Sequence, residues 1–218
     1  MSRRPPQSSA PVAGLKDRKR VAAMRQIQVV AVRLFDEHGF DHVTVEEIAA
    51  QADASPSSVY RYFGTKEGIL IQDEYDEYLL STTLRLLTRH DIYTAAELAL
   101  RDIGPDHFQK DQDLTSRRGR YFFEVPSVRA ALYLRMNDAV MMISEALVAS
   151  NHSPRYDLLR AHVVVNSVLW GLLAATEDVV MGRSDEPLEV ALQRALEAIR
   201  PHAGSADPTQ DASSDGPA

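Results

Sequence analysis

Three helix-start signals between residues 44 and 65 constrain the fold of this chain more than any other feature. Thr44-Val45-Glu46-Glu47 has the pattern of a capping box, in which the Thr and Glu side chains each bind the backbone N–H of the other residue. Ser55-Pro56 combines an N-cap residue with a proline at the first helical position. Thr65 is a third N-cap residue. These signals predict short helices at 44–52 and 55–63, followed by a helix from 66 to about 89.

A longer helix is predicted at 16–38, in front of the two short ones. Its apolar residues fall at the spacing i, i+4, i+7 and i+8, which marks one face of a helix: Ile27, Ala31, Leu34 and Phe35. Gly39 then provides a stop. Because Asp53-Ala54 leaves room only for a tight turn between the short helices, residues 16–64 have the spacing of a helix-turn-helix unit.

The second helix of such a unit places its N-terminal residues in the major groove of DNA. Here that helix lies in the segment SPSSVYRYFGTKEGIL, residues 55–70. Short hydroxyl side chains let the backbone approach DNA, phenols suit phosphate, and arginine suits phosphate or guanine. A lysine in the first turn of a helix opposes the helix dipole, which makes sense if a phosphate lies in front of it. The predicted DNA-facing residues are Ser57, Ser58, Tyr60, Arg61, Tyr62 and Lys66.

The alternative is that the aromatic residues only close a small hydrophobic core. We adopt it for Val59 and Phe63, which lie four residues apart and would face Ile27, Leu34 and Ile48. For Tyr60, Tyr62 and Lys66 taken together we favour DNA contact, because three phosphate-compatible groups share one face.

Charge is distributed unevenly along the 218 residues. The formal net charge of −7 by itself argues against a nucleic-acid partner. However, residues 1–72 carry 10 Lys+Arg against 8 Asp+Glu, whereas residues 73–218 carry 14 against 23. Because local charge decides whether a face meets phosphate, the N-terminal part remains compatible with DNA.

The segment TVEEIAAQADASPSSVYRYFGTKEGIL resembles the DNA-binding segment of TetR/AcrR-type transcriptional repressors. The resemblance covers about residues 18–72 and includes RLFDEHGFDHVTV, the pattern S-x-x-x-V-Y-x-Y-F and the T-K-E cap after it. It implies an all-α homodimer that binds palindromic double-stranded DNA and is released by a small ligand in its C-terminal domain. Gly64 departs from many members, which carry a proline or a polar residue there. The positions that match the family's DNA contacts are Thr44, Ser55, Ser57, Ser58, Tyr60, Tyr62 and Lys66.

The rest of the chain is also predicted to be helical, at 94–103, about 106–123, 126–150, 154–182 and 186–200, with no strand-like alternation. The expected fold class is all-α. An N-terminal three-helix helix-turn-helix DNA-binding domain occupies 16–72, and a C-terminal helical ligand-binding and dimerisation domain occupies 73–201. The segments 1–15 and 202–218 are expected to be a disordered arm and a disordered tail.

Apolar stripes run along the last predicted helices. Those of 154–182 and 186–200 suit a homodimer in which two helices from each protomer form a four-helix bundle. The alternative is that they only complete the core of one chain.

A ligand cavity needs apolar walls and a few polar anchors. The segments YFFEVPSVRAAL and LWGLLAATED are similar to a TetR-type subgroup that includes regulators associated with the mycofactocin system, and this similarity implies an acyl-CoA-like effector. Arg117, Arg118 and Arg120 could meet a phosphate-bearing ligand or form a solvated helix face. The predicted ligand-binding residues, for each of which a place in the plain core is the alternative, are Tyr121, Phe122, Tyr133, Met136, Asn137, Met141, Asn166 and Trp170.

No pattern of catalytic residues is found. The seven histidines form no HxH pair, there is no cysteine, and no Gly-rich phosphate loop or GxSxG motif occurs. We therefore expect no enzyme activity, no metal site and no cofactor. Absence of cysteine and of an apolar run of about 20 residues favours a cytoplasmic protein without a membrane partner. A second hypothesis is a helical small-molecule-binding or scaffold protein without specific DNA binding.

Overall fold

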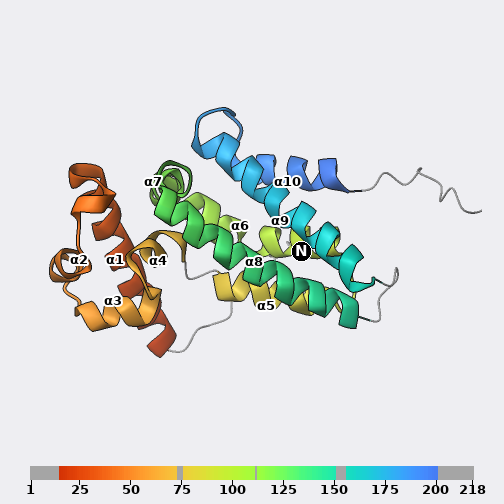
Figure 1. Ribbon diagram of the computed structural model, residues 1–218, viewed down its shortest axis with the longest axis horizontal. Coiled ribbons are helices and arrows are strands. Elements are labelled where there is room, and N and C mark those ends of the chain that lie inside the picture. The colour runs from red at the N-terminus through yellow and green to blue at the C-terminus, as the bar shows by residue number, and fades with distance from the viewer. Residues whose placement is uncertain (1–14, 73–75, 111, 151–155, 201–218) are drawn as a thin grey trace, which may run out of the picture.

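The computed structural model describes residues 15–72, 76–110, 112–150 and 156–200. The elements in these ranges are helices throughout, as the all-α prediction requires (Figure 1). The predicted arm and tail lie outside the described residues, except for Leu15, which begins the first helix. The elements are α1 (Leu15–His38), the 3-10 helix η1 (Phe40–His42), α2 (Val45–Gln51), α3 (Pro56–Phe63), α4 (Lys66–Ile71), α5 (Asp76–Leu86), α6 (Ile92–Lys110), α7 (Gln112–Glu124), α8 (Pro126–Ala149), α9 (Leu158–Val180) and α10 (Leu188–Ile199).

The three helix-start signals form the caps that the sequence predicts. The Thr44 hydroxyl accepts the backbone N–H of Glu47 at 3.2 Å, and the Glu47 carboxylate accepts the backbone N–H of Thr44 at 2.8 Å. The Ser55 hydroxyl accepts the backbone N–H of Ser58 at 3.2 Å, and the Thr65 hydroxyl accepts that of Gly68 at 3.0 Å. A side-chain cap of this kind stabilises a helix by about 1 kcal/mol, so these bonds fix where α2, α3 and α4 begin.

Helices α1 to α4 enclose one hydrophobic core. Val59 and Phe63 of α3 are each 1% exposed and lie in the same cluster as Ile27 and Ile48, which confirms the prediction that they face inward. Val128 of α8 also belongs to this cluster. The helix-turn-helix unit therefore packs directly against the C-terminal half of the chain.

The helix predicted at 66–89 is in fact two helices, α4 and α5. Gln72, which follows α4, has extended backbone with φ −97° and ψ 141°. Its side-chain amide donates to the carbonyl oxygen of Phe63 at 2.8 Å, and its own carbonyl oxygen accepts from the side chain of Gln28 at 2.6 Å. These bonds hold the end of α4 against α1 and α3. Apolar periodicity could not reveal this break, because Gln28 and Gln72 are 44 positions apart in the sequence.

Helices α5, α6, α8, α9 and α10 form a second core at the other end of the molecule, and α4 lies between this group and α1–α3 (Figure 1). Within this bundle α9 packs against α8 and α10, and α6 packs against α5, α7, α9 and α10. The sequence predicts separate helices at 94–103 and 106–123, but α6 continues to Lys110 and α7 begins at Gln112. Helix α6 runs through Gly104 and Pro105, since helix propensity is a weak prior that tertiary context can override.

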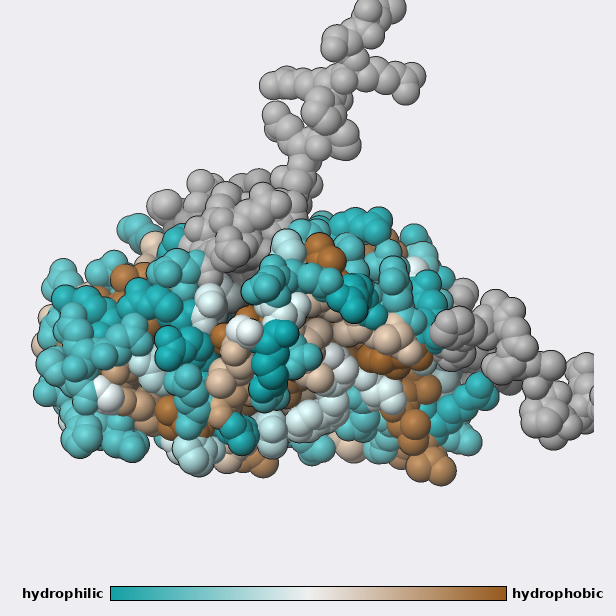
Figure 2. All heavy atoms as spheres, turned by 90° about the horizontal axis from the view of Figure 1, so that it is seen from above, coloured by the Kyte–Doolittle hydropathy of each residue, from teal (hydrophilic) through white to brown (hydrophobic). Residues whose placement is uncertain are grey.

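Helix α9 carries an apolar face that the described residues leave uncovered. By length and composition this helix could cross a membrane, which corrects the expectation that no such apolar run exists, although one such helix is weak evidence of a membrane span. Only 17% of its most apolar window is buried. Leu159 and Val163, four residues apart, are 75% and 57% exposed. Seen from above, hydrophobic residues gather on the half that carries α5–α10, whereas the end that carries α1–α3 is mostly hydrophilic (Figure 2).

Candidate nucleic-acid interface and ligand cavity

The start of α3 presents hydroxyl groups to solvent. Ser55 and Ser57 are exposed and Ser58 is half-buried. The Ser55 hydroxyl lies 3.0 Å from that of Ser57 and 2.9 Å from that of Ser58. This cluster offers hydrogen-bond donors and acceptors at the positive end of a helix, where an anion is favoured.

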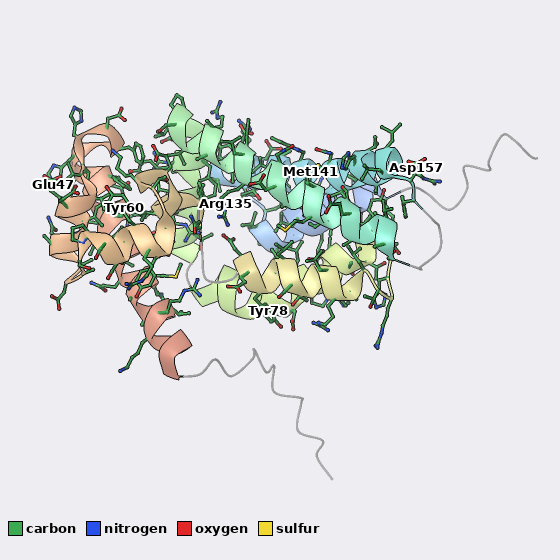
Figure 3. The ribbon with its side chains drawn as sticks, turned by 60° about the horizontal axis from the view of Figure 1, so that its bottom comes forward. Glu47, Tyr60, Tyr78, Arg135, Met141 and Asp157 are labelled. Carbon is green, nitrogen blue, oxygen red and sulfur yellow. The ribbon has the colours of Figure 1, made fainter. Side chains whose placement is uncertain are left out.

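Tyr60, Arg61 and Tyr62 continue this surface along α3. Tyr60 is 47% exposed (Figure 3). Arg61 lies over the ring of Tyr62, with its guanidinium carbon 4.9 Å from the ring centre. One guanidinium nitrogen donates to the hydroxyls of Ser58 at 3.2 Å and Tyr62 at 3.3 Å. These contacts hold Arg61 in place and leave its other N–H donors available to a phosphate or a base.

Thr44 lies at the start of α2, on the exposed side of the unit. Its hydroxyl donates to the Glu47 carboxylate at 2.9 Å while accepting the backbone N–H of that residue. Hydrogen bonds from the backbone N–H and the hydroxyl of Thr44 hold the pKa of Glu47 below its ordinary value. Because the hydroxyl proton is already used within the capping box, Thr44 can meet DNA only as an acceptor or through its methyl group.

The structure gives Lys66 a role that the sequence argument missed. Its ammonium group donates to the carbonyl oxygens of Phe40 at 2.8 Å and Val43 at 3.1 Å, and lies 4.3 Å from the centre of the Phe40 ring. The argument that a phosphate must explain a cation at this helix start is therefore wrong, because two carbonyl groups and an aromatic ring explain it. One N–H of the ammonium group remains, and its contact with DNA stays a prediction.

A polar contact joins this unit to the C-terminal half. Asp36 of α1 accepts the phenol O–H of Tyr121 at 2.6 Å and the Nε–H of Arg117 at 2.9 Å, both from α7. Burial acts to raise the pKa of Asp36, but the hydrogen bonds from Tyr121 and Arg117 outweigh it and lower the pKa below the ordinary value of 3.8. Burial and the bond to Asp36 in turn raise the pKa of Tyr121.

Comparison with known proteins agrees with this geometry. Residues 27–72 match the family described as bacterial regulatory proteins, tetR family. HTH-type transcriptional regulators from Mycobacterium bovis and Mycobacterium tuberculosis are each 32% identical to this chain over 82 residues. The DNA-binding segment is of the TetR type. That match covers 36% of this chain and 40% of the length of these relatives.

Solved TetR-type structures share the fold. The fatty acid degradation regulator FadR of Bacillus halodurans has a TM-score of 0.51 at 16% identity, covering 87% of this chain and 96% of that protein. The TetR family repressor FadR of Thermus thermophilus, in complex with lauroyl-CoA, has a TM-score of 0.51 at 19% identity, covering 81% and 92%. At such identities the likeness shows the fold alone. The matched family consists of transcriptional regulators and not enzymes, in agreement with the sequence-based expectation.

The C-terminal bundle has an apolar cavity of about 290 Å³, open to solvent, between α5, α6, α8 and α9. At its edge, a guanidinium nitrogen of Arg135 on α8 donates to the carboxylate of Asp76 on α5 at 3.0 Å. Figure 3 shows Arg135 on the side of α8 that faces α5. The remaining walls are mainly hydrocarbon, from Leu79, Leu80, Ile92, Ala96, Leu100, Leu132, Met136, Ala139, Ile143, Val168, Leu169 and Leu172, with Thr83 among them.

Most of the predicted ligand-binding residues lie elsewhere. Met136 lines the cavity. It is not lined by Tyr121, Phe122, Tyr133, Asn137, Met141, Asn166 or Trp170, so this cavity does not support ligand contact by these seven, which stays a prediction. Phe122 packs against the core of the helix-turn-helix unit, and Tyr121 binds Asp36. The other five belong to the α8–α9 region.

Three of those five are accounted for by local contacts. The rings of Tyr133 and Trp170 contact each other edge to face with centres 4.8 Å apart, and the side chain of Asn166 donates to the carbonyl of His162 in its own helix at 2.7 Å. The sequence analysis sought aromatic and amide side chains, whereas the cavity is formed mainly by aliphatic side chains of α5, α6, α8 and α9. The i, i+4 and i+8 spacing of Ile92, Ala96 and Leu100 in α6 was an available signal.

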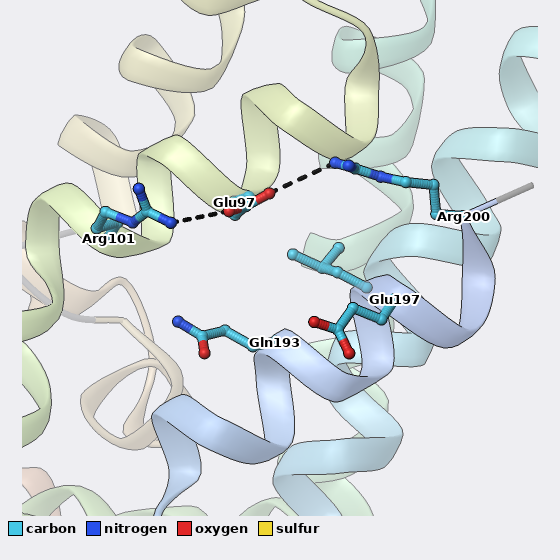
Figure 4. Close-up of a pocket in the computed structure, with 6 residues that line it drawn as sticks. Glu97, Arg101, Gln193, Glu197 and Arg200 are labelled. Atoms are coloured by element: carbon cyan, nitrogen blue, oxygen red, sulfur yellow. Dashed lines mark hydrogen bonds and ion pairs between the residues drawn. The ribbon is translucent and has the colours of Figure 1, made fainter. Parts of the chain in front are cut away.

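A second cleft, of about 390 Å³, lies between α6 and α10 (Figure 4). Three of its four charged groups bind one another, since Glu97 pairs with Arg101 at 2.9 Å and with Arg200 at 3.5 Å. Arg117, Arg118 and Arg120, for which the sequence raised a phosphate-bearing ligand, do not line either space. We therefore regard the cavity between α5, α6, α8 and α9 as the better site for an apolar ligand.

Proposed function

We propose that the chain is a ligand-responsive transcriptional repressor that binds a palindromic operator as a homodimer. The observation that carries the proposal is the exposed surface of hydroxyl, phenol and guanidinium groups on α3, whose opposite face is fixed in the core by Val59 and Phe63. We place the protein in the cytoplasm and the boundary between its two domains at 72/73. The proposed DNA contacts are Thr44, Ser55, Ser57, Ser58, Tyr60, Arg61, Tyr62 and the remaining N–H of Lys66.

The dimer interface that we propose uses α9 and α10. Leu159 and Val163 of α9 and Val190 of α10 are exposed in the single chain, and burying apolar surface favours association by about 25 cal/mol per Å² of area. Four helices, two from each protomer, would cover these faces. Such a dimer can present two α3 helices about 34 Å apart, which is one turn of B-DNA.

We propose that a small, mostly apolar effector occupies the cavity between α5, α6, α8 and α9 and weakens DNA binding. The route is short, because α4 packs against α1 and α3 on one side and against α7 and α8 on the other. An effector that favours one arrangement of α8 therefore acts on the position of the DNA-binding unit. By linkage, an effector that weakens DNA binding must itself bind the DNA complex less tightly. An acyl-CoA-like effector fits the similarity to the lauroyl-CoA-bound FadR of Thermus thermophilus.

Binding to the DNA upstream of the chain's own gene tests the proposal. The full chain should bind with an affinity that falls steeply with salt, because each phosphate neutralised contributes about 0.9 to the slope of log K against log salt. Tyr60→Phe removes one phenol O–H and keeps the ring, so it should weaken binding several-fold without unfolding the chain. Tyr133→Phe, at an exposed tyrosine of α8, is the matched control and should leave binding unchanged.

The alternative function is a helical ligand-binding or scaffold protein without specific DNA binding. It predicts a flat salt dependence and no difference between Tyr60→Phe and Tyr133→Phe. That pair of results would rule out the repressor proposal.

A further inference from the structure

The cavity between α5, α6, α8 and α9 has hydrocarbon walls and one charged pair. Thr83 contributes a hydroxyl, but that hydroxyl donates to the carbonyl oxygen of Leu79 in its own helix at 2.8 Å. The charged side chains among the residues that line the cavity are Asp76 and Arg135. Because the Thr83 hydroxyl proton is already used, an acceptor group of a ligand held within these walls finds its hydrogen-bond donor at Arg135.

Arg135 has most of its hydrogen-bonding capacity unused. Its guanidinium group carries five N–H donors in a planar fork, and the bond to Asp76 uses one nitrogen at 3.0 Å. The two side chains are 44% and 40% exposed. A pair this exposed to water stabilises the fold little, so Arg135 can exchange its partner at small cost.

Breaking the bond between the two side chains costs less free energy at Asp76 than at Arg135. Asp76 is the first residue of α5, where the positive end of the helix dipole favours a carboxylate. Arg135 lies in the middle of α8, far from either helix end, against the leucine walls of the cavity. A cationic ligand would have to take Asp76 from Arg135 and leave that guanidinium without its carboxylate. The arrangement therefore favours an anionic ligand over a cationic one.

We propose that this cavity binds an apolar molecule with one anionic group, whose carboxylate or phosphate displaces Asp76 and forms two parallel hydrogen bonds with Arg135. The inference rests on the proposed function and specifies its effector. It also indicates which contact would change when the ligand binds. The Asp76–Arg135 bond ties the start of α5 to α8, and Asp76 lies four residues after Gln72, which is bonded to α1 and α3. Binding of an anion to Arg135 would break the Asp76–Arg135 bond and so free the start of α5 from α8.

Calorimetric titration of the full chain with four molecules of equal chain length tests the proposal: decanoate, n-decyl phosphate, decan-1-ol and decylamine. At least one of the two anions should bind about tenfold or more tightly than decan-1-ol, as expected for charged hydrogen bonds, and decylamine should bind no better than the alcohol. The order of decanoate and decyl phosphate identifies which anion the site prefers.

Variants test whether Arg135 and Asp76 cause the preference for anionic ligands. Arg135→Gln should abolish the preference for anions and leave the affinity for decan-1-ol unchanged. Asp76→Asn should strengthen anion binding, because the competing carboxylate is gone. Arg120→Gln, which removes the cation of an exposed pair on α7 away from the cavity, is the matched control and should change neither affinity.

Three results would overturn the inference: equal binding of decanoate, decyl phosphate and decan-1-ol, an equal loss of all ligands in Arg135→Gln, or no binding of any of the four. If decan-1-ol releases the chain from DNA as effectively as decanoate, the repressor proposal stands and the anionic preference is wrong. The DNA titration of Tyr60→Phe needs no ligand, so it separates failure of the repressor proposal from failure of this one.

Discussion

Replacing Lys66 by alanine should lower the free energy of unfolding by about 2–3 kcal/mol. The ammonium group makes two partly buried hydrogen bonds, to the carbonyl oxygens of Phe40 and Val43, and lies over the ring of Phe40. Allowing for water around the half-buried side chain, each charged bond contributes about 1 kcal/mol, and the contact with the ring adds about 0.5–1 kcal/mol. The bonds connect α4 to the segment between α1 and α2, so their loss should loosen the helix-turn-helix unit.

Urea unfolding followed by circular dichroism measures this change. Lys19→Ala, at an exposed lysine of α1, removes the same charge and should alter stability by less than about 0.5 kcal/mol. Equal stability of Lys66→Ala and the unmodified chain would refute the anchoring role. The salt dependence of DNA binding by Lys66→Ala, measured where the variant is folded, decides the separate question of phosphate contact. A slope smaller by about 0.9 means that Lys66 also neutralises a phosphate, and an unchanged slope means that it does not.

Three other perturbations address the packing of α4, the contact between α1 and α7, and the dimer. A Cβ on Gly68 would lie 1.9 Å from the carbonyl oxygen of Phe63. Gly68→Ala should therefore lower the free energy of unfolding, measured by thermal unfolding, by about 1–3 kcal/mol. Unchanged stability would contradict the close packing of α4 on α3. The pKa of Asp36 is lowered in the folded state, so the stability that this carboxylate contributes is fully present above the unfolded-state pKa near 3.8 and is lost as pH falls through the lower folded-state pKa. In Asp36→Asn the free energy of unfolding should therefore fall less steeply on acidification than in the unmodified chain. Identical curves would show that Asp36 contributes nothing. Val163→Glu, on the exposed face of α9, should convert the proposed dimer to a monomer in sedimentation experiments. The control Leu134→Glu, at a 70% exposed leucine of α8, should remain dimeric. If both variants are dimeric, the interface lies elsewhere.

Features carried by neighbouring residues could be predicted from the sequence. The caps at Thr44, Ser55 and Thr65 formed where the side chains indicated, because each cap joins residues three positions apart. The inward face of α3 followed from a four-residue spacing. The exposure of Ser57 and Tyr60 followed from the same periodicity, since residues that cannot point to the core must point to solvent.

The sequence by itself determined that this chain is all-helical, that a helix-turn-helix unit lies near its N-terminus, and which side of α3 faces outward. Only the tertiary structure decided that Lys66 bonds to the chain before α2, that Gln28 and Gln72 end α4, and that the cavity is formed by α5, α6, α8 and α9 instead of by the aromatic residues of α7 and α8. The physical reason is the range of the interactions. Caps and helical faces depend on residues within a few positions of each other, whereas these bonds and cavity walls join residues tens of positions apart, which only the packed chain brings into contact.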